Sequence, residues 1–243
     1  MDLDEEQILD YLHVLKSRHK TPSDSFFKHT VYGLRYAYRI FGMKEMRVVL
    51  PSIERPKKLP VVLSCKEVKQ LLRTPKLLKH RLVLAMLYGC GLRSFELRNL
   101  QVRDLDFDRM AVHVRQGKGR KDRYVPLSKI QARGLKKYLL AENPVTWCFT
   151  GNDRTGSPAR LSSQGVGWIV REARTRSGIQ KEITAHILRH SYATHLLEMG
   201  LDIMSVKDLL GHADIQTTLI YLHVAQSGRQ KPFSPLDGLY EKA

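Results

Sequence analysis

Apolar side chains recur at helical spacing over most of the chain, and this periodicity predicts a mainly helical protein. Two amphipathic helices are expected near the N-terminus, at residues 4–16 and 24–41. The apolar positions of the second helix are Phe27, Val31, Leu34, Tyr38 and Phe41. Their simplest interpretation is a small packed core.

A proline-rich segment follows these two helices and predicts a boundary between domains. Residues 51–60 contain three prolines, which break helices and are typical of linkers. We therefore expect a short helical domain over residues 1–50 and a larger domain over residues 61–225. Residues 226–243 remain as a C-terminal tail.

The first half of the larger domain is expected to combine helices with one β-hairpin. A capping-box pattern from Ser64 to Glu67 opens a helix, and an apolar helix at 76–89 precedes a short one at 94–100. Alternating apolar residues predict strands at 110–116 and 122–127, joined by a glycine-containing turn.

The second half of the larger domain has a helical pattern throughout. Its expected helices are separated by glycines and lie at 162–177, 185–199, 203–210 and 217–225. The predicted fold class is therefore mainly α with a small antiparallel β-sheet. No glycine-rich phosphate loop opens a helix after a strand, so the pattern gives no indication of nucleotide binding.

Charge adds a candidate partner to this picture. The chain has 41 Lys and Arg against 24 Asp and Glu, a net charge of +17 and a pI near 9.9, which favours nucleic-acid binding. The scattered Cys65, Cys90 and Cys148 argue against disulfides and against a cysteine-based zinc site. The N-terminus is not typical of a signal peptide, and no apolar run is long enough for a membrane span. We expect a cytoplasmic protein.

Three histidines lie within residues 184–195, next to an arginine. Thr184 is a plausible N-cap, which places His186, Arg189 and His190 on one face of the first helical turns. The spacing of His186 and His190 matches that of a zinc helix, but the catalytic glutamate and a third ligand are missing. An anion site built from Arg189, His186 and the helix N-terminus is the favoured interpretation.

A second candidate segment runs from Leu209 to Val224. Gly211 is expected to end one helix, and Thr217 to cap the next, so that Tyr221 lies one turn in. Without further context, Tyr221 would be a half-buried core tyrosine, and His212 a loop residue.

Four segments in this order resemble the catalytic domain of the tyrosine recombinases, the phage-integrase and Xer family. His-x-Leu-Arg-His is intact in the third segment, and Tyr221 follows His212 by nine positions in the fourth. The similarity runs from about residue 60 to residue 225. The four segments are Tyr88-Gly-Cys-Gly-Leu-Arg93-Ser-Phe-Glu96-Leu, Gln116-Gly-Lys118-Gly-Arg-Lys, residues 184–195 and residues 209–224.

The resemblance implies a role for each matching residue. Arg93 and Arg189 would clamp the scissile phosphate of double-stranded DNA, and Glu96 would help to hold these arginines. Lys118 would act as general acid on the departing 5′ oxygen. His186 would handle the tyrosine proton, and His212 would hydrogen-bond the phosphate. Tyr221 would attack and form a 3′-phosphotyrosine, and His190 and His195 are interpreted as structural.

These residue types suit the chemistry independently of the resemblance. Two guanidiniums can neutralise the transition-state charge of phosphoryl transfer without a metal. A tyrosine has a free pKa near 10 and needs cationic neighbours or a base before it can attack. The expected activity is site-specific recombination without metal, ATP or another cofactor. The alternatives are relaxation of supercoils by a type IB topoisomerase and a DNA-binding relic without strand exchange.

The resemblance is incomplete at the N-terminus. Relatives clamp DNA with a longer helical domain, so this chain is expected to be a truncated form or to use a minimal clamp. The resemblance also implies a homotetramer on synapsed DNA sites, and a monomer or dimer when free. Residues 233–243 are expected to dock on the neighbouring protomer.

Overall fold

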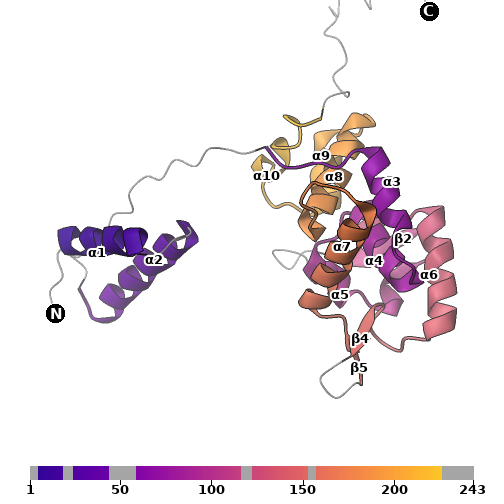
Figure 1. The fold of residues 1–243 in the computed structure, drawn as a ribbon, viewed down its shortest axis with the longest axis horizontal. Coiled ribbons are helices and arrows are strands. Elements are labelled where there is room, and N and C mark those ends of the chain that lie inside the picture. Colours follow the sequence, from indigo (N-terminus) through magenta and orange to yellow (C-terminus); the bar gives the residue numbers. More distant parts are fainter. Residues whose placement is uncertain (1–4, 19–23, 44–58, 116–121, 153–156, 226–243) are drawn as a thin grey trace, which may run out of the picture. The chain divides into compact units, whose positions relative to one another are not determined.

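The computed structural model describes residues 5–18, 24–43, 59–115, 122–152 and 157–225. Two compact units divide the chain, Met1–Lys58 and Leu59–Ala243 (Figure 1). Their boundary falls within the proline-rich segment for which the sequence predicts a linker. Residues 51–58 of that segment lie outside the described part of the chain.

The first unit contains the two predicted helices, α1 (Glu5–Arg18) and α2 (Asp24–Ile40). Ile8, Leu12 and Val31 are buried between them. The prediction that Phe41 belongs to this core is wrong, because its side chain is 77% exposed. The helix ends at Ile40 and the chain turns at Gly42 (φ +71°), so Phe41 leaves the apolar face of α2.

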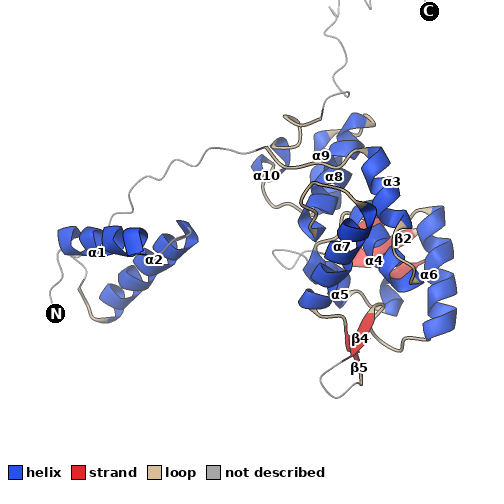
Figure 2. Cartoon of the chain, viewed as in Figure 1, coloured by secondary structure: helices blue, strands red, loops and turns tan. Residues whose placement is uncertain are grey.

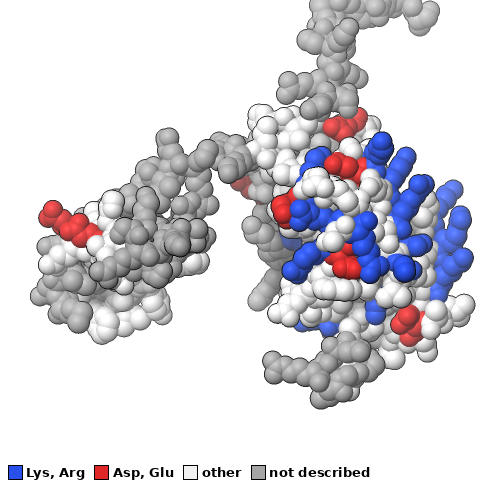
Figure 3. All heavy atoms as spheres, viewed as in Figure 1, with Lys and Arg blue, Asp and Glu red and all other residues white. Residues whose placement is uncertain are grey.

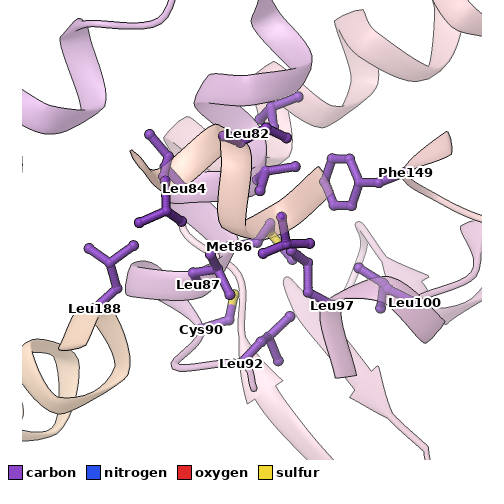
Figure 4. Packing of buried hydrophobic residues seen from close by; sticks show 14 of the residues in the cluster. Leu82, Leu84, Met86, Leu87, Cys90, Leu92, Leu97, Leu100, Phe149 and Leu188 are labelled. Atoms are coloured by element: carbon purple, nitrogen blue, oxygen red, sulfur yellow. The ribbon is translucent and has the colours of Figure 1, made fainter. Parts of the chain in front are cut away.

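The second unit is built around α4 (Leu78–Gly89). This helix contacts helices on several sides, and five of its residues are buried: Leu82, Val83, Leu84, Met86 and Leu87. A helix that is apolar all round needs such cover. Figure 4 shows four of them, Leu82, Leu84, Met86 and Leu87, packed with Leu97, Phe149 and Leu188 from other elements. The covering helices are α3 (Cys65–Arg73), α5 (Ser94–Asn99), α6 (Lys129–Glu142), α7 (Ser163–Ser177) and α8 (Ala185–Glu198).

A three-stranded antiparallel sheet lies beside these helices (Figure 2). Its strands are β1 (Leu105–Asp106), β2 (Ala111–Val114) and β3 (Arg123–Pro126), and a 3₁₀ turn at Val102–Asp104 leads into it. Val112 pairs with Val125, and both are buried. The predicted hairpin is therefore present, although its turn at 116–121, with Lys118, lies outside the described residues.

Besides the short strand β1 and the 3₁₀ turn, two features have no counterpart among the predicted elements. One is α6, which begins with a capping box in which Ser128 and Gln131 exchange hydrogen bonds. The other is a small ribbon of β4 (Thr150–Asn152) and β5 (Pro158–Arg160). Neither changes the fold class, which is mainly helical with a small antiparallel sheet, as predicted.

The last predicted helix, at 217–225, is wrong in length and in its cap. After α9 (Ile203–Leu210) the only described helix is the single turn α10 (Gln216–Leu219). The Asp214 carboxylate, and not Thr217, accepts a hydrogen bond from the first helical amide. The amide of Tyr221 then donates to the Thr218 carbonyl three residues back, so the chain tightens into turns.

Among the described residues, no helix is long and apolar enough to cross a membrane.

Candidate active site

Arg189 occupies the centre of the candidate site and is 1% exposed. Thr184 caps α8, as predicted, by accepting a hydrogen bond from the amide of Ile187. The Arg189 guanidinium donates to the carbonyls of Gly91 (2.7 Å) and Leu210 (2.5 Å). Burial and the neighbouring charge of Arg93 lower the pKa of Arg189 to about 10, so it remains cationic at neutral pH.

Arg93 reaches the site from the turn between α4 and α5. This turn needs Gly91, whose backbone has φ +58° and whose Cβ, if it existed, would lie 2.4 Å from the ring of Tyr192. Arg93 is the N-cap residue of α5, and its guanidinium donates a hydrogen bond to Glu96 (2.8 Å). Its side chain is partly exposed, which leaves part of this cation open to a ligand.

Glu96 holds the arginines together. Its carboxylate accepts hydrogen bonds from the backbone and guanidinium of Arg93 and from both terminal nitrogens of Arg123, and it lies 3.6 Å from Arg189. Burial alone would raise the pKa of Glu96, but the hydrogen bonds and charge of Arg123 lower it to about 2. The carboxylate is therefore ionised and fixes the arginine site, in the place that the resemblance implies.

Arg123 is a site residue that the sequence interpretation missed. Its Nε donates to the carbonyl of Leu209 (2.8 Å), and its two terminal nitrogens bind Glu96. It therefore joins β3 to the end of α9 and to the arginine site. Its register in the strand was the available signal. Arg123 and Val125 share the inward face of β3, and the exposed residues between and after them lie on the other face.

Replacing Arg123 by lysine is expected to lower both stability and cleavage. A lysine cannot reproduce the two parallel hydrogen bonds to a carboxylate, and the Leu209 carbonyl would lose its donor. We expect a loss of about 1–3 kcal/mol in the free energy of urea unfolding. The matched control is Arg109→Lys, whose ion pair with Asp106 is largely exposed and should change stability by less than about 1 kcal/mol. Equal stabilities of the two variants would contradict this role.

Tyr221 lies in the turn after α10 and is 1% exposed. One face of its ring is stacked with His212, at 6.5 Å between centroids. His212 is fixed by contacts of both ring nitrogens, Nδ1 with the Thr218 hydroxyl (2.9 Å) and Nε2 with Arg189 (3.2 Å). Burial raises the pKa of Tyr221, and the charges of Arg189 and Arg93 act in the opposite direction. The arginines thus favour the phenolate that would attack.

The hydroxyl of Tyr221 contacts His190, which the sequence interpretation treated as structural. Nδ1 of His190 lies 2.9 Å from this hydroxyl. The His186 ring packs edge-on against His190, with centroids 4.1 Å apart. Burial, followed by the charges of Arg189 and Arg93, lowers the pKa of His186.

The structure thus brings together five of the six residues named from the sequence: Arg93, His186, Arg189, His212 and Tyr221. The sixth, Lys118, lies outside the described residues. His195 makes a separate pair, in which its Nδ1 lies 2.8 Å from the hydroxyl of Tyr88. Within the described part of the chain, no three His, Cys, Asp or Glu side chains gather into a possible metal site.

Comparison with known proteins identifies the family. Residues 62–227 match the family model described as the phage integrase family. The chain is 37% identical to tyrosine recombinase XerA of Thermococcus onnurineus over 93% of its length and 82% of that protein. It is 39% identical to XerA of Thermococcus kodakarensis over 80% of its length and 69% of the relative.

Solved structures agree with this relation. A crystal structure of XerA recombinase covers 98% of this chain and 82% of its own, with a TM-score of 0.64 and 28% identity. The pre-cleavage complex of XerH recombinase with its difH substrate has a TM-score of 0.72 over 91% of this chain and 67% of its own, at 24% identity. That second likeness concerns the fold alone. This chain therefore belongs to the phage integrase family and is a tyrosine recombinase.

Proposed function

We propose that this chain cuts and rejoins double-stranded DNA at specific sites, with Tyr221 as the nucleophile. The observation that carries the proposal is the position of the Tyr221 side chain, which is stacked on His212. The charges of Arg189 and Arg93 act to lower the pKa of its hydroxyl. Attack by its hydroxyl gives a 3′-phosphotyrosine and a free 5′ hydroxyl. The covalent bond conserves the energy of the broken phosphodiester, so that a new strand can be joined without ATP.

Arg93, Arg189 and His212 are the proposed ligands of the scissile phosphate. Negative charge grows on the phosphate oxygens in the transition state, and prearranged cations and donors lower its energy most when they need no reorganisation. Glu96 and Arg123 provide that order through hydrogen bonds of 2.8–2.9 Å. His186, beside the two arginines, completes the anion site.

Lys118 is the proposed general acid for the departing 5′ oxygen. β2 and β3 pair in register up to Val114 and Arg123, and Arg123 contacts Glu96 directly. Arg123, two residues beyond the segment that carries Lys118, is thus part of the arginine site, which supports the assignment. A lysine there can follow the leaving group and protonate it.

Surface charge supports DNA as the partner. Figure 3 shows Lys and Arg side chains gathered on one face of the second unit, over α3, α6 and α7. Exposed members of this basic surface include Lys66, Lys69 and Arg73 of α3 and Arg133 and Lys137 of α6. Such a surface attracts the phosphate backbone without reading sequence.

We further propose that the first unit belongs to a helical DNA-binding domain. We also propose that four protomers assemble on two DNA sites. An apolar groove supports an assembly in which residues 233–243 of one protomer dock on the next. The groove is lined by Leu197, Gly200, Leu201, Ile203, Leu222 and Ala225, together with Asp202. Deleting residues 233–243 should leave cleavage of a single site intact and weaken assembly in sedimentation.

The experiment that tests the proposed function uses nicked duplexes carrying inverted repeats from the DNA that flanks the gene. A recombinase should form an adduct with this DNA that resists SDS and persists in EDTA, and with two intact duplexes it should form joined products. Relaxation of a supercoiled plasmid without joined products would indicate a topoisomerase instead. Binding without any adduct would indicate a relic.

A further inference from the structure

We propose that His190 is a catalytic residue that takes the proton of Tyr221 when this tyrosine attacks DNA. The inference rests on the proposed function and changes one assignment, because the resemblance gives this proton to His186. Among the described residues, His190 is the hydrogen-bond partner of the Tyr221 hydroxyl, with 2.9 Å between Nδ1 and the phenolic oxygen. This separation is within the range for direct proton transfer.

The surroundings of His190 keep its ring uncharged. Burial, followed by the charges of His186 and Arg189, lowers its pKa to about 4. The ring is therefore neutral at physiological pH, and Nδ1 can accept the hydrogen bond that the phenol donates. The Tyr221 ring also packs against the ring of His190, and His212 is stacked on the Tyr221 ring.

His186 and His190 have different neighbours, which separates their roles. The His186 ring lies 4.1 Å from that of His190, and the charges of Arg189 and Arg93 act on it, so we assign it to the phosphate. His190 lies one turn further along α8, against Tyr221. We therefore assign His186 to the phosphate and His190 to the nucleophile, Tyr221.

The proposed step balances in protons and bonds. As the bond from the Tyr221 oxygen to phosphorus forms, the phenolic O–H breaks and His190 becomes an imidazolium. The bond from phosphorus to the 5′ oxygen breaks, and the general acid protonates that oxygen. In rejoining, the 5′ hydroxyl attacks, the general acid recovers its proton, and His190 returns its own to the tyrosine.

The variant His190→Asn tests this step. The asparagine oxygen can take the place of Nδ1 and accept the hydrogen bond, but it cannot take the proton at neutral pH. Single-turnover cleavage of the nicked duplex should slow by roughly 10²–10⁴-fold. Its rate should also rise with pH, because hydroxide must remove the proton, while the wild-type rate stays nearly flat between about pH 6 and 9.

A substrate with sulfur in place of the 5′ bridging oxygen separates the base from the general acid. A thiolate leaves without a proton, so this substrate should restore cleavage by Lys118→Ala but not by His190→Asn. The matched control is His195→Asn, which makes the same replacement at the equivalent contact to Tyr88 on the same helix and should cleave at the wild-type rate. Circular dichroism checks folding, and His190→Gln serves as the second variant.

Three results would overturn the inference. The first is a wild-type cleavage rate for His190→Asn. The second is a slow rate for this variant with the pH dependence of the wild type. The third is rescue of His190→Asn by the sulfur substrate. Each of them would leave the proposed function standing if the wild-type protein still forms its adduct. Absence of the adduct from the wild type would instead remove the proposed function, and the inference with it.

Discussion

Replacing Tyr221 by phenylalanine is expected to abolish the covalent protein–DNA adduct. The substitution removes the one oxygen that can attack, and the ring still fills its buried position beside His212. Loss of the nucleophile leaves the phosphate ligands in place, so DNA affinity should remain near the wild-type value. Gel electrophoresis in SDS after incubation with the nicked duplex measures the adduct, and filter binding measures the affinity.

The matched control for this variant is Tyr88→Phe. The hydroxyl of Tyr88 also contacts a histidine of α8, but that histidine is His195. The control should form the adduct at the wild-type level. An adduct in Tyr221→Phe would mean that another residue attacks the DNA.

Replacing Glu96 by alanine is expected to cause the largest loss of stability in the second unit. The carboxylate is ionised, buried and bound to Arg93 and Arg123, and Arg189 lies close by. Removing one partner of a buried ion pair leaves charges uncompensated and costs about 3–5 kcal/mol. Because Trp147 and Trp168 both lie in the second unit, tryptophan fluorescence during urea unfolding measures this loss.

The control for Glu96→Ala is Glu182→Ala. Glu182 also pairs with an arginine, Arg174, but its side chain is 77% exposed. An exposed pair contributes about 1 kcal/mol or less. Similar losses in the two variants would contradict a central role for Glu96.

The contribution of Glu96 should depend on pH in a defined direction. Its pKa is about 2 in the folded protein, against 4.5 for an unperturbed glutamate. A lowered folded pKa gives stability that is present above about pH 4.5 and is lost as the pH falls towards 2. The stability advantage of the wild type over Glu96→Gln should therefore shrink across this interval. An advantage that grows with acid would contradict the pKa assignment.

The sequence predicted most of the helices because their apolar periodicity and their caps agree. Gly178 and Gly211 end α7 and α9 in the left-handed conformation that glycine favours. In contrast, α6 was not predicted although Ser128 and Gln131 form a capping box, because the exposed Ile130 and Leu140 blur its apolar periodicity. The final helix is shorter than predicted because the amides of Tyr221 and Leu222 donate to carbonyls three residues back, so the chain continues as turns.

The candidate site was predictable where a residue type and its spacing carry the chemistry. This group consists of Arg93, Arg189, His212 and Tyr221, which lie in sequence segments with a recognisable order and spacing. Arg123 and His190 were not predicted, because their importance arises from partners far away in sequence. Arg123 meets Glu96 and Leu209 only after the sheet packs against α5 and α9, and His190 meets Tyr221 only across the fold.

The most direct test of the central claim is to locate the covalent bond to DNA. The wild-type protein is trapped on the nicked duplex, digested with nuclease and protease, and analysed by tandem mass spectrometry. The expected result is a nucleotide linked through its 3′ phosphate to Tyr221. A nucleotide on another residue, or a 5′ linkage, would contradict the mechanism.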